Sequence, residues 1–110
     1  ISSANNSNNN IIANNVSSNN TWEGITLSSS NNNTVIGNIC NNNNNGIYIN
    51  SSNNNIATGN ICIRDGGYTA AQGTIYLNTS NNNIVLGNQC KGKAPTISGG
   101  TGNIVEHNRT

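Results

Sequence analysis

The stretch SNNNTVIGNIC at residues 30–40 occurs twice more in nearly the same form, as SNNNIATGNIC at 52–62 and SNNNIVLGNQC at 80–90. Looser copies begin at Ser7 and Gly100, so five copies follow one another at spacings of 23, 22, 28 and 20 residues. Repeats of this length are typical of solenoid proteins. A chain with 30 Asn among 110 residues is often a disordered tract, but disorder gives no reason to keep positions in register.

Two asparagine columns run through all five copies, at fixed distances from the first residue of each copy. Asparagine tolerates the left-handed backbone conformation of tight bends, and its amide both donates and accepts hydrogen bonds. We therefore expect each column to be an internal ladder of amides bonded along the solenoid axis, with Gly37, Gly59 and Gly87 in the bend before the second ladder. The predicted ladders are Asn10, Asn33, Asn55, Asn83 and Asn103, and Asn15, Asn38, Asn60, Asn88 and Asn108.

Apolar residues form further columns with the spacing of β-strands. Ile25 and Leu27, two residues apart, have β-branched or apolar equivalents in the following copies, and the position of Val35 is apolar in every copy. Alternation of this kind indicates strands. Each copy is thus expected to supply three short strands and to form one coil of an all-β, single-stranded parallel β-helix. About five coils of 20–28 residues would stack to roughly 24 Å at the parallel-strand spacing of ~4.8 Å.

This helix is expected to form one domain over residues 1–110. The last copy has Pro95 in the isoleucine column and gathers Glu106, His107 and Arg109, a combination typical of solenoid caps. No comparable feature lies near Ile1. We therefore expect the chain to be the C-terminal part of a longer protein.

The repeats NTVIGNIC, NIATGNIC and NIVLGNQC resemble those of the NosD and carbohydrate-binding/sugar-hydrolase group of right-handed parallel β-helix proteins. With the KAP and GGTGNIVEHN segments near the end, they are also similar to β-helix proteins of bacterial and prophage genomes, including tail-spike-like proteins. The resemblance implies a right-handed helix in a secreted, surface or virion-associated module that usually recognises or processes polysaccharide. The acidic and basic residues that lyases and hydrolases of this architecture place on one face have no counterpart that we can map here.

Charge and composition exclude several functions. The net charge of +1 gives no electrostatic footprint for nucleic acid, and no apolar run is long enough for membrane insertion. Glycoside hydrolysis usually needs two carboxyl groups ~5–9.5 Å apart. The register separates Glu23 from Glu106 by about three coils, near ~14 Å. Asp65 is expected to form an ion pair with Lys93, so we expect no enzyme, although a lyase using Arg64, Lys91 or Lys93 as the base is conceivable.

Neither histidine nor cysteine suggests a metal or cofactor site. Because successive strand residues face opposite sides, Glu106 and His107 are not expected to converge. Cys40, Cys62 and Cys90 fall in one column, and thiols ~4.8 Å apart in a line cannot surround one metal ion. We expect them to be stacked core residues, and a disulfide between neighbours is geometrically marginal.

Aromatic residues are the candidates for ligand binding. Tyr48 and Tyr76 should stack one coil apart on the outside, with Trp22 on a nearby bend and Tyr68 in the longest loop, residues 63–72. Aromatic faces beside Asn and Ser suit the apolar patches and hydroxyl groups of sugar rings, so a cell-surface glycan is the candidate ligand. The alternative is ordinary cross-strand aromatic pairing, which is the commoner situation.

An outward apolar strip is also expected, because the residues on either side of the Val35 column should face solvent. It includes Ile56, Ile84 and Ile104, and it suggests contact with another copy of the chain or another domain. The alternative is a register slip of one residue, which would place these residues in the core and bury Glu106.

Together these observations indicate a structural or recognition module of a surface, secreted or phage-tail protein. The expected location is extracellular, at a cell surface or in a virion. Two alternatives remain open: a fragment of a polysaccharide-active lyase or hydrolase that lacks a complete active site, and a subunit that assembles into filaments.

Overall fold

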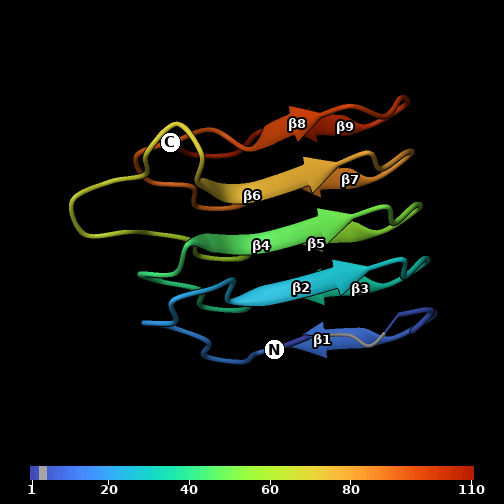
Figure 1. Ribbon diagram of the computed structural model, residues 1–110, viewed down its shortest axis with the longest axis horizontal. Helices are drawn as coiled ribbons and strands as arrows, with labels where there is room; N and C mark the ends of the chain where they lie inside the picture. Colours follow the sequence, from blue (N-terminus) through green and yellow to red (C-terminus); the bar gives the residue numbers. More distant parts are fainter. Residues whose placement is uncertain (3–4) are drawn as a thin grey trace.

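The computed structural model describes residues 1–2 and 5–110, whose strands wind into a column of stacked coils (Figure 1). One parallel sheet has the order β1-β3-β5-β7-β9 and the other the order β2-β4-β6-β8, so the chain alternates between two sheets. In Figure 1 the chain crosses the nearer sheet, turns, returns through the farther sheet and rises by one coil, which is a right-handed winding. The predicted right-handed parallel β-helix is confirmed.

The strands of one sheet are short, and those of the other are longest in the middle of the column. The first sheet consists of β1 (Ile11–Ala13), β3 (Thr34–Ile36), β5 (Ile56–Thr58), β7 (Ile84–Leu86) and β9 (Ile104–Glu106). The second consists of β2 (Ile25–Ser28), β4 (Asn45–Asn50), β6 (Gly73–Asn78) and β8 (Thr96–Ser98). Equivalent residues of successive coils are paired, as the repeat register predicts.

The third strand of each coil is reduced to a single bridging residue. Gly37 (φ 66°) and Asn42 (φ 55°) are left-handed on either side of Ile39, so extended backbone cannot continue there. The expectation of three strands per coil was therefore wrong in this segment. The isolated parallel bridges join Val16, Ile39, Ile61, Gln89 and Arg109.

Both predicted asparagine ladders are confirmed. The backbone N and the side-chain Nδ2 of each ladder asparagine donate to Oδ1 of its equivalent one coil later, at 2.8–3.1 Å. In the central coils Nδ2 also donates to a carbonyl of the coil before, as from Asn55 to Ser30 at 3.0 Å. The buried amide groups are thus paired within the protein, which removes the cost of taking them out of water.

In the bends, the left-handed backbone conformation and the ladder hydrogen bonds belong to two neighbouring residues, whereas we expected one asparagine to provide both. The left-handed residue is the one just before each ladder position: Asn32 (φ 57°) precedes Asn33, and Gly37 (φ 66°) precedes Asn38. The predicted role of Gly37, Gly59 and Gly87 in the second bend is therefore confirmed, whereas the ladder asparagines themselves do not have positive φ.

Two further ladders were not predicted. Buried serines form one of them, since the backbone N of Ser30 donates to Oγ of Ser52 at 2.9 Å and that of Ser52 donates to Oγ of Ser80 at 3.1 Å. On the outside, the backbone N of Asn53 donates to Oδ1 of Asn31 at 2.7 Å, so this outer ladder points opposite to the inner ones. Its equivalent bonds include those to Asn8, Asn53 and Asn81.

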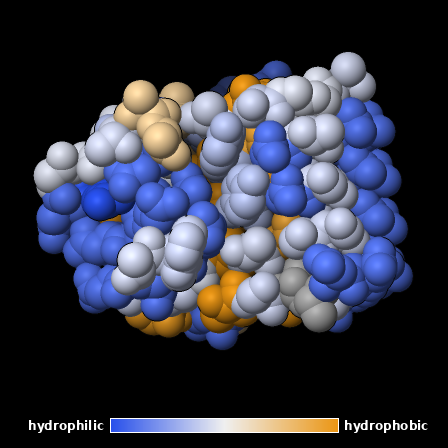
Figure 2. Space-filling view, viewed as in Figure 1, coloured by the Kyte–Doolittle hydropathy of each residue, from blue (hydrophilic) through white to orange (hydrophobic). Residues whose placement is uncertain are grey.

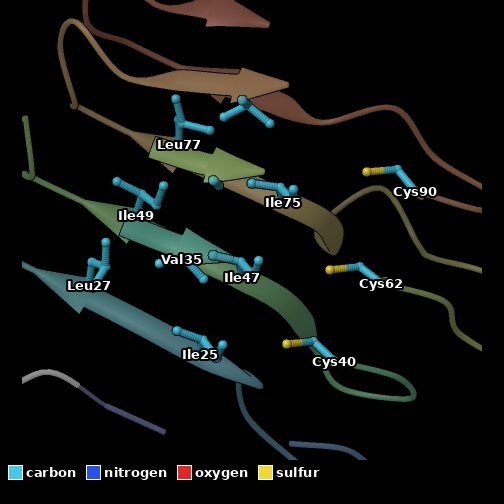
Figure 3. Close-up of a cluster of buried hydrophobic side chains, with 12 residues drawn as sticks. Ile25, Leu27, Val35, Cys40, Ile47, Ile49, Cys62, Ile75, Leu77 and Cys90 are labelled. Carbon is cyan, nitrogen blue, oxygen red and sulfur yellow. The ribbon is translucent and has the colours of Figure 1, made fainter. Parts of the chain in front are cut away.

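The core is a narrow apolar stack between the two sheets (Figure 3). Val35, Ala57 and Val85 are fully buried on the five-stranded sheet, whereas Ile56, next to Ala57, is 39% exposed. The expected register is therefore correct, and the slip by one residue is excluded. The other fully buried apolar residues are Ile25, Leu27, Ile47, Ile49, Ile75, Leu77, Cys40, Cys62 and Cys90.

Candidate functional site

Tyr48 and Tyr76 stand next to each other on the outward side of β4 and β6. They are register partners in the parallel sheet, and their ring centroids are 5.6 Å apart with an interplanar angle of 32°. Ile47 and Ile49 on either side of Tyr48 are fully buried, so strand alternation holds the ring outward. The predicted aromatic stack is confirmed as a geometric feature.

Amide groups hold this stack from one side. Nδ2 of Asn78 donates to Oδ1 of Asn50 at 2.8 Å and to Oη of Tyr48 at 3.3 Å. The side chains of two coils are thereby linked, and the Tyr48 hydroxyl keeps its own hydrogen free to donate outward. The result is a pre-ordered surface of rings, amides and hydroxyl groups.

We call the outward side of the four-stranded sheet the Tyr face. None of its side chains carries a charge, and all of them are polar or aromatic. Figure 2, which looks onto this sheet, shows a pale centre of intermediate hydropathy with strongly hydrophilic residues to either side. The Tyr face consists of Thr26, Ser28, Tyr48, Asn50, Tyr76, Asn78, Thr96 and Ser98.

The other two candidate aromatic residues lie outside the Tyr face. Trp22 is 74% exposed at the corner before β2, where its carbonyl accepts a bond from the backbone N of Asn44 at 2.9 Å. Tyr68 is partly buried. Its hydroxyl oxygen is shielded from solvent and has no hydrogen-bond partner among the described residues. Burial, followed by the nearby thiols of Cys62 and Cys90, raises the pKa of Tyr68. Its hydroxyl is therefore not presented to a ligand in solution.

The long loop is fixed by Lys93. Its Nζ donates to the carbonyls of Thr69 at 3.0 Å, Ala70 at 3.1 Å and Gln72. Asp65 instead exchanges two bonds with the side chain of Asn42, at 2.7 and 3.2 Å. The predicted ion pair between Asp65 and Lys93 is therefore wrong, because the loop carbonyls accept the hydrogen bonds of the Lys93 ammonium group.

Each acidic residue has its own partner. Glu23 accepts a bond from Nδ2 of Asn45 at 3.1 Å, and Asp65 accepts one from Nδ2 of Asn42 at 3.2 Å. Glu106 lies 3.9 Å from Nε2 of His107, and both side chains are mostly exposed. The expectation that Glu106 and His107 would point apart was wrong, because His107 (φ 52°) lies in the bend after β9 rather than in the strand.

Among the residues that the structure describes, two hollows lie toward the C-terminal end of the column, and no residue of the Tyr face lines either of them. One of about 160 Å³ is lined by Pro95, Glu106 and His107 among others, and one of about 300 Å³ by Gln89, Lys91, Arg109 and Thr110. Each contains charged side chains from a single region of the column, without the paired carboxyl groups of a glycosidase.

The outward apolar strip is present as predicted, with Ile84 half-buried between Ile56 and Ile104. Ile56 and Ile104 are 39% and 47% exposed, and Ile36 and Leu86 lie beside them on the same sheet. Contact of this strip with another subunit or domain stays a prediction.

Within residues 1–2 and 5–110 there is no helical segment with the length and apolarity needed to cross a bilayer.

The cysteines form the buried column that the sequence predicts. Cys40, Cys62 and Cys90 are free thiols, fully buried, on successive coils, and their sulfur atoms point toward the isoleucine column (Figure 3). The part of the chain that the structure describes contains no group of three or more His, Cys, Asp or Glu side chains that could hold a metal ion.

Comparison with known proteins gives one finding. A family model described as "Periplasmic copper-binding protein (NosD)" matches residues 1–110, the whole chain. No curated protein and no solved structure matches the chain. The match agrees with the resemblance carried by the GN-containing repeats, and it spans both the Tyr face and the thiol column.

Proposed function

Because the chain belongs to the NosD family, we propose that it is a structural β-helix module of the cell envelope that binds polysaccharide through the Tyr face. The observation that carries the proposal is the pre-ordered pair of Tyr48 and Tyr76, 5.6 Å apart and linked to the amide of Asn78. The printed family description is periplasmic, which favours the cell envelope over a phage tail.

The ladders supply the rigidity that such a module needs. A ligand loses less binding free energy when the groups that it contacts are already ordered. Tyr48 and Tyr76 lie on strands between fully buried residues. The neighbouring amides of Asn50 and Asn78 are hydrogen-bonded to each other. The Tyr face therefore offers contact area at a small entropic cost.

The chemistry of the Tyr face favours an uncharged sugar chain. Tyrosine rings present apolar faces and a polar edge, and the amides of Asn50 and Asn78 both donate and accept hydrogen bonds. No charged side chain belongs to this surface, so a polysaccharide of uronic acids or sulfated sugars would find no cationic partner there.

We further propose binding without turnover. Glu23 and Asp65 each accept a hydrogen bond from a different asparagine side chain, and Glu106 pairs with His107. Hydrolysis needs one group that acts as the acid and a second that acts as the base or nucleophile, both beside the same glycosidic bond. These side chains do not supply such a pair.

Affinity electrophoresis through gels containing neutral or acidic polysaccharides tests the proposal. The intact protein should be retarded by at least one neutral polysaccharide, and a variant carrying both Tyr48→Ala and Tyr76→Ala should lose most of the retardation. Thr34→Ala, on the outward side of the other sheet, is the matched control and should behave as the intact protein.

Retardation that survives the double substitution would contradict the role of the Tyr face. Release of reducing or unsaturated sugar, abolished by Asp65→Asn, would instead establish the enzymatic alternative.

A further inference from the structure

The description of the NosD family raises the question of where copper would bind in this chain. Cu(I) prefers soft sulfur ligands, and Cu(II) prefers nitrogen and oxygen ligands in a tetragonal arrangement. The chain contains three Cys, one His and no Met, so the thiol column and His107 are its strongest candidate ligands.

The thiol column does not surround any point from several sides. Cys40, Cys62 and Cys90 come from equivalent positions of successive coils, and all three sulfur atoms point the same way, toward the isoleucine column (Figure 3). Metal coordination requires donors that converge on the ion. Here the groups opposite the sulfur atoms are fully buried isoleucine side chains, which offer no donor.

There is also no room beside the middle thiol. A single carbon atom added to Gly46 would lie 2.8 Å from the Sγ of Cys62, 2.8 Å from its Cβ and 2.5 Å from the carbonyl oxygen of Thr74. Because the space between Gly46 and Cys62 cannot accept even one methyl group, it cannot accept a metal ion on that side of the thiol without local opening of the coils.

The protonation states of two of the three thiols agree with this geometry, whereas the hydrogen bond with Cys62 lowers the pKa of Cys40 from its ordinary value. The hydrogen bond with Cys40, together with burial, raises the pKa of Cys62 well above its ordinary value, and burial raises the pKa of Cys90. Metal binding to cysteine requires the thiolate form. Both thiols therefore stay protonated at neutral pH in the folded protein.

His107 does not provide an alternative. It lies in the exposed bend after β9, and its contact with a described acidic group is the 3.9 Å approach to Glu106. One imidazole and one carboxylate leave most positions around Cu(II) to water. The residues of this chain do not fit the metal that the family description names.

We infer that this chain carries no copper site, and that its cysteines are space-filling core residues shielded from metal ions while the coils are stacked. Gly24 and Gly46 leave room for two of the thiols: an added carbon at Gly24 would lie 3.0 Å from Cβ of Cys40, and one at Gly46 would lie 2.8 Å from Cβ of Cys62.

The test is competition for copper under anaerobic conditions. The Cu(I)–bicinchoninate complex is mixed with folded protein and, separately, with protein unfolded in guanidinium chloride. The folded protein should withdraw less than one tenth of an equivalent of Cu(I) on mixing, whereas the unfolded protein should withdraw Cu(I) at once. Slow withdrawal at the rate of unfolding, measured by circular dichroism, would also support the inference.

Rapid withdrawal of one equivalent or more by the folded protein, abolished by Cys62→Ala, would overturn it. For Cu(II), competition against glycine should show no binding that depends on His107. Binding that survives glycine and disappears in His107→Gln would also overturn the inference. Ellman's reagent gives an independent measure, because shielded thiols should react only after unfolding.

Discussion

The side-chain oxygen of Asn55 accepts two hydrogen bonds from Asn33, one from the backbone N at 2.8 Å and one from Nδ2 at 3.1 Å. Both residues are buried, with Asn33 1% and Asn55 0% exposed. One carboxamide oxygen of Asn55 therefore accepts both the backbone and the side-chain hydrogen bond of Asn33 in the preceding coil.

Asn55→Ala should strongly destabilise the protein. The substitution leaves the buried backbone N of Asn33 without its acceptor, and a buried donor without a partner costs ~1–3 kcal/mol. With the second lost acceptor contact, we expect the free energy of unfolding to fall by about 2–4 kcal/mol in guanidinium denaturation. Asn10→Ala is the matched control: Asn10 is exposed, so the loss there should stay below ~1 kcal/mol. Equal losses at the two positions would contradict the ladder account.

Gly100→Ala should be much more harmful than Gly59→Ala. Both glycines are left-handed, at φ 93° and φ 63°, but an added carbon at Gly100 would collide with the carbonyl of Ser80, whereas nothing lies within 4 Å of one at Gly59. Gly59→Ala should therefore cost only the ~1–2 kcal/mol of a left-handed alanine. Gly100→Ala should in addition open the last coil, measured as faster hydrogen exchange at Ile104 and Val105. Similar exchange in both variants would refute the predicted collision.

Tyr68→Phe should leave the protein as stable as before or stabilise it by about 1 kcal/mol, because it removes a buried hydroxyl that has no partner among the described residues. Tyr48→Phe makes the same chemical change where the hydroxyl accepts a bond from Asn78, and it should not stabilise. Thermal unfolding of the two variants side by side measures the difference. A loss of stability in Tyr68→Phe would mean that the hydroxyl has a partner in solution.

The free energy of unfolding should fall at alkaline pH. The pKa values of Cys62 and Cys90 are raised above the ordinary value of 9.0 in the folded protein. Below pH 9 both states hold these two protons, so Cys62 and Cys90 have no effect, and the lowered pKa of Cys40 makes stability rise toward pH 9. Above it the unfolded chain loses protons that the folded chain keeps, and stability should decline by up to ~1.4 kcal/mol per pH unit for each thiol.

Urea denaturation between pH 8 and pH 10.5 measures this slope. Cys62→Ala combined with Cys90→Ala should flatten it, and an equally steep slope in that variant would assign the effect to other groups.

Repetition made most of the fold predictable from the sequence. Equivalent positions of the copies become neighbours, so the inward side of Val35, the cysteine column and the contact of Tyr48 with Tyr76 all follow from the alignment. The outer ladder through Asn31 was missed because only columns with asparagine in all five copies were interpreted as ladders, and its last member is Thr101.

Prediction failed where the backbone departs from the repeat. Asp65 and Lys93 occupy equivalent positions in the repeat. The loop that follows Asp65, however, places three of its carbonyl groups against the ammonium group of Lys93, namely those of Thr69, Ala70 and Gln72. The direction of Tyr68 depends on the same loop. Counting positions cannot describe an insertion, because the inserted residues have no equivalents in the other coils.

Within the two inner ladders each amide donates to Oδ1 of its equivalent in the next coil, while the outer ladder donates to Oδ1 of the coil before. The same inner-ladder bonds therefore recur at every junction between coils. Gain or loss of one complete turn by gene duplication or deletion would restore every bond at the junction, whereas a partial turn would leave both ladders mismatched. Such a protein can change its length only in whole turns.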